Sequence, residues 1–307
     1  MDSTKTATFL ERRPRLFGIA YRMLGARHEA EDAVQEAYLR WHQSDESTLR
    51  SADAWLVSLT TRVCIDRLRA LKVEREAYLG PWLPEPLLTQ DVDSPERQLE
   101  LAGDVSIAFL TLLERLSPEE RAAFLLREVF EFDYAEIASA LDRGEGACRQ
   151  MVYRAKARLK SGQPRFEVSE KQHRALIERF VAASTAGDMN RLAALLAEDA
   201  RLTADGGGKV VVVTRPLLGA QRIARLFHVT ARWVDEHSAV LGYRSVRING
   251  QPGLLRLFND KPHSVLAFDT DGTKIRSIFV LANPDKLEGL DALLHADSSR
   301  ESVAGRT

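Results

Sequence analysis

The chain has 307 residues, which is long enough for two or three domains that each bury a core. Its composition, 45% hydrophobic and 28% charged residues, is typical of a globular protein and excludes wholesale disorder. The formal net charge is −1, so any binding of nucleic acid must depend on local basic patches. Residues 1–160 carry 23 Lys and Arg against 27 Asp and Glu, a balance of −4 that leaves acidic faces for a protein partner.

The two cysteines, Cys64 and Cys148, fall on apolar faces of predicted helices. This position favours reduced thiols in a cytoplasm over a disulfide framework or a metal cluster. No apolar run approaches the length of a membrane span, and the N-terminus lacks the core of a signal peptide. We therefore expect a cytoplasmic protein with no membrane contact, no metal and no cofactor.

Residues 12–77 predict three helices. Gly25 is the expected C-cap of the first helix, and Asp53 could cap the third. The second helix buries an apolar stripe, so its opposite face presents Asp32, Gln35 and Glu36. The third helix presents three basic side chains, Arg62, Arg67 and Arg69.

A proline-rich segment follows over residues 78–98. Residues 78–86 contain three prolines and cannot be helical throughout. A stiff spacer is the plain interpretation, but an aromatic among prolines favours a segment that docks on another surface. The residues concerned are Trp82, Leu83, Pro84, Glu85 and Pro86. An acidic tract with Asp91, Asp93, Glu96 and Glu100 follows them.

The stretch from Ser117 to Lys160 predicts a helix-turn-helix. Ser117-Pro118-Glu119-Glu120 supplies an N-cap, a proline in the first turn and two acids there. A second helix begins at Asp133, where Glu136 completes a capping box, and Asp142-Arg143-Gly144 makes the next turn. The third helix is expected to bury Cys148, Val152, Ala155 and Leu159.

The outer face of that third helix is basic, with no acid between Arg149 and Lys160. The residues expected on it are Arg149, Gln150, Met151, Tyr153, Arg154, Lys156, Arg158 and Lys160. An ordinary amphipathic helix with a basic outer face is the alternative. A turned helix pair before the basic run favours DNA binding, because a major groove admits one helix whose side chains reach bases and phosphates.

Residues 170–296 predict an α+β domain. Two helices come first, with apolar residues over 176–181 and 192–196. Short apolar runs follow at 210–213, 253–258, 265–268 and 275–281. Asn249-Gly250 and Asp271-Gly272 lie between such runs and predict hairpins, so helices precede an antiparallel sheet.

Two further motifs are Asp205-Gly206-Gly207-Gly208-Lys209 and Asn283-Pro284-Asp285-Lys286-Leu287. The glycine run could be a flexible turn between strands. Its lysine is a weak indication of a phosphate site, because the wider spacing of a P-loop is missing. The Asn-Pro stretch could merely end a strand.

These residues resemble a known family. Residues 32–41, with Trp55-Leu56 and residues 66–69, resemble domain two of extracytoplasmic-function (ECF) sigma factors, and residues 117–159 are similar to domain four. The C-terminal part resembles the SnoaL-like members of the cone-shaped fold shared with nuclear transport factor two. Residues 82–86, 205–209 and 283–287 look like the signature of a sigma-factor subgroup whose fused SnoaL-like domain regulates it in place of a separate anti-sigma protein.

The resemblance implies two all-α sigma domains, a three-helix domain two and a helix-turn-helix domain four, followed by an α+β cone. The implied parts are domain two (1–77), a linker (78–98), domain four (99–163), the SnoaL-like domain (170–296) and a flexible tail (297–307). The face with Asp32 and Glu36 would dock on the clamp helices of RNA polymerase core enzyme. Residues 43–51 and the start of the Trp55 helix would read the minus-ten element of promoter DNA, and domain four the minus-thirty-five element.

Several alternatives remain open at this point. Trp41 and Trp55 could stack on bases, although aromatic side chains are more often part of a core. Relatives of the cone fold include enzymes, and the acid/base candidates for catalysis are Asp205, His228, Asp235, Glu236 and His237. The third hypothesis is a one-component repressor whose C-terminal domain senses a small ligand. For a sigma factor, we expect the C-terminal domain to pack against residues 82–86 and domain four.

Overall fold

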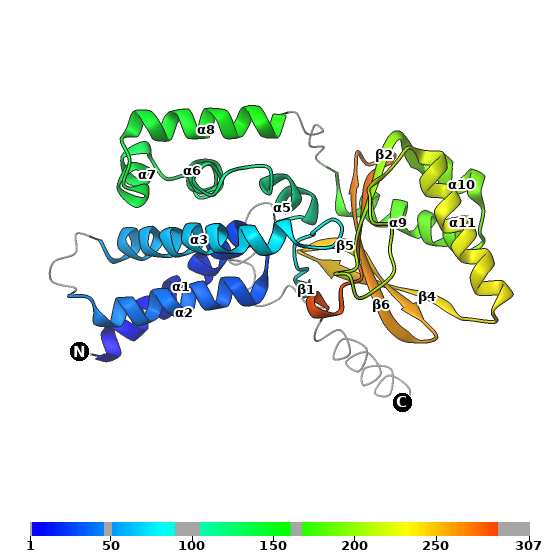
Figure 1. Cartoon of the computed structure of the whole chain (residues 1–307), viewed down its shortest axis with the longest axis horizontal. Coiled ribbons are helices and arrows are strands. Elements are labelled where there is room, and N and C mark those ends of the chain that lie inside the picture. Colours follow the sequence, from blue (N-terminus) through cyan, green and yellow to red (C-terminus); the bar gives the residue numbers. More distant parts are fainter. Residues whose placement is uncertain (1, 46–50, 90–104, 161–167, 288–307) are drawn as a thin grey trace. The chain divides into compact units, whose positions relative to one another are not determined.

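The computed structural model describes residues 2–45, 51–89, 105–160 and 168–287 (Figure 1). The chain divides into two compact units, of which the first comprises Met1–Ala77 with Asp91–Pro164 and the second Tyr78–Gln90 with Arg165–Thr307. The start of the expected linker therefore groups with the C-terminal unit. The predicted acidic tract, the predicted tail and most of the loop over residues 43–51 lie outside the described residues.

Three helices begin the first unit: α1 (Asp2–Leu24), α2 (Arg27–Gln43) and α3 (Ala52–Glu76). Gly25 follows α1 with φ +69° and donates its N–H to the Tyr21 carbonyl at 2.8 Å, which confirms the predicted C-cap. The expectation that Asp53 caps α3 is wrong. Ser51 is the N-cap, because its hydroxyl accepts the Ala54 N–H, while Asp53 lies in the first turn and pairs with Arg15.

Four helices complete this unit: α5 (Ile107–Leu113), α6 (Pro118–Glu128), α7 (Tyr134–Leu141) and α8 (Glu145–Lys160). Capping boxes open α6 and α7, and the second is the predicted pair of Asp133 and Glu136. Asp142 ends α7 in the left-handed region at φ +52°, so the chain turns into α8 where the sequence predicts. The helix-turn-helix is present.

The second unit is built on a seven-stranded mixed sheet in the order β1-β4-β5-β6-β7-β2-β3. Its strands are β1 (Leu88–Thr89), β2 (Leu196–Asp205), β3 (Leu217–Leu218), β4 (Leu241–Ile248), β5 (Gln251–Phe258), β6 (Lys261–Thr270) and β7 (Ile275–Leu281). Strands β2 and β7 pair in parallel, and the other neighbours are antiparallel. This is the α+β, SnoaL-like cone that the sequence predicts.

Three α-helices lie against this sheet (Figure 1): α9 (Glu170–Thr185), α10 (Met189–Leu195) and α11 (Ala220–Glu236). A short 3-10 helix, η2 (Pro284–Lys286), follows β7. The core joins Phe180 of α9 and Phe227 of α11 to Phe268 of β6. Burial of these aromatic side chains is a main stabilising contribution of the unit.

Two turn predictions are confirmed and one strand prediction is wrong. Asn249 and Gly250 both take positive φ between β4 and β5, and Gly272 does so between β6 and β7. Residues 210–213 form no strand. Val211 is fully exposed, whereas Val212 and Val213 pack beside the core in irregular backbone.

Candidate functional sites

The exposed face of α2 carries the residues expected to bind polymerase. Asp32, Gln35 and Glu36 are all exposed, while Ala33, Val34 and Ala37 on the other face are buried. Glu36 pairs with Arg40 one turn later, and a guanidinium nitrogen of Arg67 lies 3.9 Å from the Asp32 carboxylate. Leu39 continues this row at 52% exposure. Leu39 was not among the residues predicted to bind polymerase, although its position seven residues after Asp32 marks the same helical face.

The arginines of α3 are engaged within the first unit. Arg62 donates to the carbonyl oxygens of Ala140 at 2.9 Å and Ser139 at 3.0 Å, at the end of α7. Arg69 donates to the Glu119 carboxylate, and this bond raises the pKa of Arg69. Residues predicted to contact DNA therefore hold α3 against the helix-turn-helix.

Arg67 has a different set of partners. It forms an ion pair with Glu29 of α2, and that hydrogen bond is the main cause of a raised Arg67 pKa. Glu29 is buried, so its carboxylate gains a compensating charge from this arginine. The contact links α3 to α2 inside domain two.

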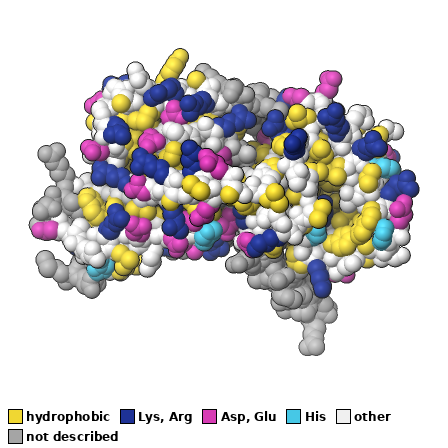
Figure 2. Space-filling view, viewed as in Figure 1, with side chains coloured by type: hydrophobic (Ala, Val, Ile, Leu, Met, Phe, Trp, Pro, Cys, Tyr) yellow, Lys and Arg dark blue, Asp and Glu magenta, His cyan; other side chains and the backbone are white. Residues whose placement is uncertain are grey.

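The outer face of α8 is basic but carries ion pairs. Arg149 bonds to Glu145 at 2.7 Å, and Lys156 lies 2.7 Å from Glu128. Arg154 and Arg158 both face Glu120 of α6. Figure 2 accordingly shows basic and acidic side chains interspersed over this unit. The helix offers dispersed cations to a phosphate backbone instead of one concentrated patch.

The positions of the remaining α8 residues are mixed. Gln150 is exposed, and Tyr153 is 75% exposed with a broad ring in solvent. The expectation of an exposed Met151 is wrong, because it is buried at 8% exposure beside Val152. Met151 lies three residues after Cys148 and four before Ala155, so helical spacing places it on the buried face. Leu159, expected in the core, is half-buried.

A buried carboxylate in the second unit gathers the three sequence motifs. Asp205, at the end of β2, is 1% exposed. Its Oδ1 accepts the Tyr78 hydroxyl at 2.6 Å and the Gly207 N–H at 3.0 Å. Its Oδ2 accepts the Leu83 N–H at 2.9 Å and Lys286 Nζ at 2.8 Å. One aspartate thus joins the proline-rich segment, the glycine turn and η2.

Lys286 makes further contacts with the proline-rich segment. Its Nζ also donates to the Leu83 carbonyl at 2.6 Å and lies 4.2 Å from the centre of the Trp82 ring. A desolvated cation over an aromatic face is a favourable contact. The Tyr78 ring lies 5.1 Å from the same Nζ, and burial followed by the bond to Asp205 raises the Tyr78 pKa. We name Tyr78, Trp82, Leu83, Asp205 and Lys286 the linker clamp.

The glycine turn fits the clamp closely. Gly207 has φ +61°, and a Cβ there would lie 2.4 Å from the Asn283 side chain. Asn283 in turn donates to the Tyr78 hydroxyl at 2.9 Å and caps η2 by accepting the Asp285 N–H. A larger residue at Gly207 is therefore excluded on both backbone and steric grounds. The turn is a packed element of the site.

The other residues of these motifs surround the clamp. Lys209 pairs with Asp285 at 2.6 Å on the surface. The remaining predicted positions lie in or beside the turns and the proline-rich segment: Pro84, Glu85, Pro86, Gly206, Gly208, Pro284 and Leu287. After them, the Leu87 N–H donates to Asn249 Oδ1, and β1 pairs with β4. Residues 78–89 therefore run along the sheet and extend it by one short strand.

Comparison with known proteins identifies the family to which this architecture belongs. Residues 9–73, which span α1 to α3, match the family model of Sigma-70 region 2, and residues 106–159, which span α5 to α8, match Sigma-70, region 4. The ECF RNA polymerase sigma factor SigJ of Mycobacterium tuberculosis is 33% identical over 90% of this chain and 91% of its own length. The chain belongs to the ECF RNA polymerase sigma factors.

Two further matches include the C-terminal unit. The probable ECF RNA polymerase sigma factor SigI of Mycobacterium tuberculosis is 30% identical over 94% of this chain and 97% of its own length. The crystal structure of Mycobacterium tuberculosis SigJ matches with a TM-score of 0.73 and 30% identity, covering 92% of this chain and 98% of that one. The fused third domain is thus part of the relationship to these sigma factors.

The acid/base candidates of the C-terminal unit have separate partners. The Asp205 carboxylate is occupied by the linker clamp, and His228 Nδ1 lies 2.6 Å from the Gly187 carbonyl. His237 stacks on Trp233 at 4.3 Å, and Glu236 pairs with Arg232. Asp235 is exposed. Among the described residues, no side-chain hydrogen bond or ion pair joins two of these five residues; the His237 backbone N–H donates to the Asp235 carbonyl where α11 ends.

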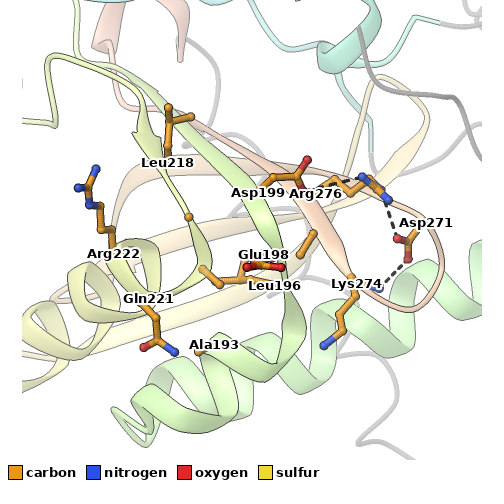
Figure 3. Close-up of a pocket in the computed structure, with 13 residues that line it drawn as sticks. Ala193, Leu196, Glu198, Asp199, Leu218, Gln221, Arg222, Asp271, Lys274 and Arg276 are labelled. Atoms are coloured by element: carbon orange, nitrogen blue, oxygen red, sulfur yellow. Dashed lines mark hydrogen bonds and ion pairs between the residues drawn. The ribbon is translucent and has the colours of Figure 1, made fainter.

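A pocket of about 800 Å³ opens beside α10, β2 and β7 of this sigma factor (Figure 3). Figure 3 shows Asp271 between Arg276 and Lys274 at its edge, with an Arg276 Nε to Asp271 distance of 3.2 Å. Burial alone would raise the pKa of Asp271, but bonds from Thr273 and Lys274 and the charge of Arg276 lower it to about 2. Asp271 and Arg276 form an ion pair, and charged residues of both signs, Glu198, Asp199, Arg222 and Lys274, also line the pocket.

The described ranges contain no helix long and apolar enough to cross a bilayer. They also contain no group of three or more His, Cys, Asp and Glu side chains arranged to hold a metal ion. Cys64 and Cys148 are both buried free thiols.

Proposed function

We propose that this sigma factor binds RNA polymerase core enzyme through α2 and promoter DNA through α3 and α8. The family membership supports this, and so does the exposed row of Asp32, Gln35, Glu36 and Leu39, whose carboxylates suit a basic partner. Arg62, Arg67 and Arg69 are assigned to the minus-ten element. Arg149, Gln150, Tyr153, Arg154 and Lys156 are assigned to the minus-thirty-five element, with Met151 supporting the helix from inside. The place of action is the cytoplasm, beside the polymerase.

The contacts of Arg62 and Arg69 imply a change on promoter binding. Arg62 bonds to α7 and Arg69 to Glu119 of α6 in the arrangement described, so they reach DNA only after α3 separates from both helices. The bonds are few and partly exposed, and each contributes about 1 kcal/mol. Polymerase and DNA contacts that favour the open state can supply this free energy.

Replacing Arg149 and Arg154 with alanine is expected to weaken binding to the upstream promoter element. Each phosphate contact that is lost should reduce the slope of log affinity against log salt by about 0.9. The measurement is promoter affinity of the sigma factor with core enzyme, at several salt concentrations. An unchanged slope with altered base preference would make these residues base readers.

Arg174→Ala is the matched control for this experiment. Arg174 on α9 pairs with Glu170 at 2.6 Å, as Arg149 does with Glu145 at 2.7 Å, and its side chain is 53% exposed against 56%. It belongs to the C-terminal unit and should leave the salt slope unchanged. If Arg149→Ala and Arg154→Ala both behave like this control, α8 is not at the DNA.

We further propose that the C-terminal unit regulates the sigma factor by holding residues 78–89. The observation that carries this proposal is the linker clamp, in which a buried ion pair fastens the segment between the two sigma domains. Promoter binding requires the sigma domains to span two elements, and the path of this segment limits how far apart they can lie. Packing of the C-terminal domain against domain four stays a prediction.

Transcription from a sigma-dependent promoter tests this regulation. We compare the full chain, a truncation before Lys171 and Trp82→Ala with the same core enzyme. The truncation and Trp82→Ala are expected to change the rate of transcript formation about fivefold or more, the lower end of usual coupling between sites. Equal rates from all three proteins would make the C-terminal unit a passenger.

The C-terminal unit acts as a regulator without catalysis in this proposal. Four of its five acid/base candidates have separate side-chain partners, and one of these four, Asp205, is occupied by the clamp. The alternative is a small-molecule enzyme fused to a sigma factor. Turnover of a small molecule by the full chain, abolished by a substitution of His228, would establish the alternative.

A further inference from the structure

A row of polar side chains crosses the sheet of the C-terminal unit and shares no residue with the linker clamp. Tyr243 of β4, Arg256 of β5 and Ser264 of β6 are paired positions in the sheet, so they share one face. The Tyr243 hydroxyl lies 3.0 Å from Ser184 Oγ of α9, which places the row on the face that the helices cover. Leu254, two residues before Arg256, belongs to the core of this face.

Arg256 is a desolvated cation with neutral neighbours. Its Nε donates to Ser264 Oγ at 2.9 Å, and its Nη2 lies 3.3 Å from His263 Nδ1. In the part of the chain that the structure describes, no carboxylate pairs with it and its Nη1 has no recorded hydrogen bond. Burial lowers the pKa of Arg256, yet a guanidinium stays charged in proteins. Arg256 is half-buried, and a charge partly withdrawn from water without a counter-charge is costly, so this position favours an anion.

His263 adds no positive charge to the site. It lies where the β5–β6 register shifts, between the pairs of Arg256 with Ser264 and of Leu257 with Pro262. Burial, and then the charge of Arg256, lower the His263 pKa, so the imidazole is neutral near pH 7. Its free ring nitrogen can bond to a ligand, while Arg256 supplies the charge.

An aromatic surface adjoins this cation. The Phe258 ring, on the same face of β5 as Arg256, lies 6.2 Å from His263 and 5.7 Å from Trp233 of α11. Trp233 is 46% exposed, so this flank is open to solvent. Figure 2 shows hydrophobic side chains beside histidines on this unit. A ligand here would meet one cation at one end and flat apolar rings at the other.

We propose that Arg256, with His263 and Tyr243, holds the carboxylate of a small organic acid whose apolar body lies against Phe258 and Trp233. The planar guanidinium fork matches a carboxylate, and Nη1 and Nη2 retain N–H donors for it. A single cation with apolar flanks suits a carboxylic acid with a ring or alkyl body better than a phosphate, which prefers several donors. The site shares no residue with the linker clamp or with the surfaces assigned to polymerase and DNA.

Benzoate is the probe for this site. We measure the thermal unfolding midpoint of the full chain in rising benzoate, with benzamide as the neutral counterpart of the same shape and inorganic phosphate as the anion without an apolar body. Benzoate is expected to raise the midpoint with saturation, and benzamide and phosphate to leave it unchanged. Arg256→Gln should weaken benzoate binding about tenfold or more, because charge-assisted hydrogen bonds are lost.

Two variants are controls for this experiment. Arg256→Lys keeps the charge but loses the fork, and should bind benzoate with intermediate affinity, which a variant that merely misfolds would not do. Arg276→Gln removes a partly buried arginine of the same sheet that already has Asp271 as a partner, and should bind benzoate normally. Absence of benzoate binding in the wild-type chain, equal binding by Arg256→Gln, or preference for phosphate or benzamide would each overturn the proposal.

Discussion

Replacing Asp205 with asparagine is expected to release the proline-rich segment from the C-terminal unit. The Lys286 side chain is only 10% exposed, and the substitution removes the carboxylate that pairs with it. It also weakens the hydrogen bonds that Tyr78 and Leu83 donate to residue 205. Breaking a buried ion pair by removing one partner costs about 3–5 kcal/mol. A loss of about 3 kcal/mol raises the opening equilibrium on the order of a hundredfold.

Hydrogen exchange at the Leu83 amide measures this release, because that N–H donates directly to Asp205. Exchange should accelerate by a comparable factor in Asp205→Asn. Asp285→Asn is the control, since it makes the same chemical change in an ion pair whose side chains are 55% and 61% exposed. A surface pair contributes about 1 kcal/mol or less. Equal exchange in the two variants would show that the clamp does not hold the segment.

Reversing the charge of both Asp32 and Glu36 to arginine is expected to abolish association with core polymerase. Both side chains are exposed: Glu36 pairs with Arg40 on α2 itself, and Asp32 lies 3.9 Å from Arg67 of α3, whose closer partner Glu29 is retained, so α2 should keep its fold. Like charges placed against a basic partner cost several kcal/mol, which corresponds to a loss of affinity of about a hundredfold or more. The measurement is equilibrium binding of the full chain to core enzyme.

The matched control reverses two exposed acids of α3, Asp66 and Glu74. It changes the net charge by the same amount and keeps the α2 face intact, so core binding should be close to wild type. Leu39→Ala should give a smaller loss than the double reversal, since it removes one apolar contact from the same row. Binding of the Asp32 and Glu36 variant at wild-type strength would remove α2 from the interface.

Features that depend on a few neighbouring residues could be predicted from the sequence. The Asp133–Glu136 capping box, the Gly25 C-cap and the Asn249-Gly250 turn all form as expected, because each is specified within five residues. Asp53 is not the cap because α3 begins one residue before it, and Ser51 occupies the N-cap position, where its hydroxyl accepts the Ala54 N–H. Helix α11 was missed altogether: Gly219 precedes it without a side-chain cap.

Features that depend on distant parts of the chain could only be guessed. Asp205 meets Tyr78, Leu83 and Lys286 across separations of 127, 122 and 81 residues, which no local pattern encodes. The motifs indicated that these segments matter, but not that one carboxylate joins them. Residues 210–213 have the composition of a strand, yet the packed glycine turn before them leads the chain off the sheet. Tertiary context overrides β propensity there.

The most direct test of regulation through the linker clamp is run-off transcription by core polymerase with wild type, Asp205→Asn or Asp285→Asn. All three proteins keep the C-terminal unit, so a difference in rate reports whether residues 78–89 are docked and not whether the domain is present. We expect Asp205→Asn to change the rate about fivefold or more, and Asp285→Asn to match wild type. A wild-type rate from Asp205→Asn, together with a fast-exchanging Leu83 amide, would contradict the account, because the segment would then be free without any effect on transcription.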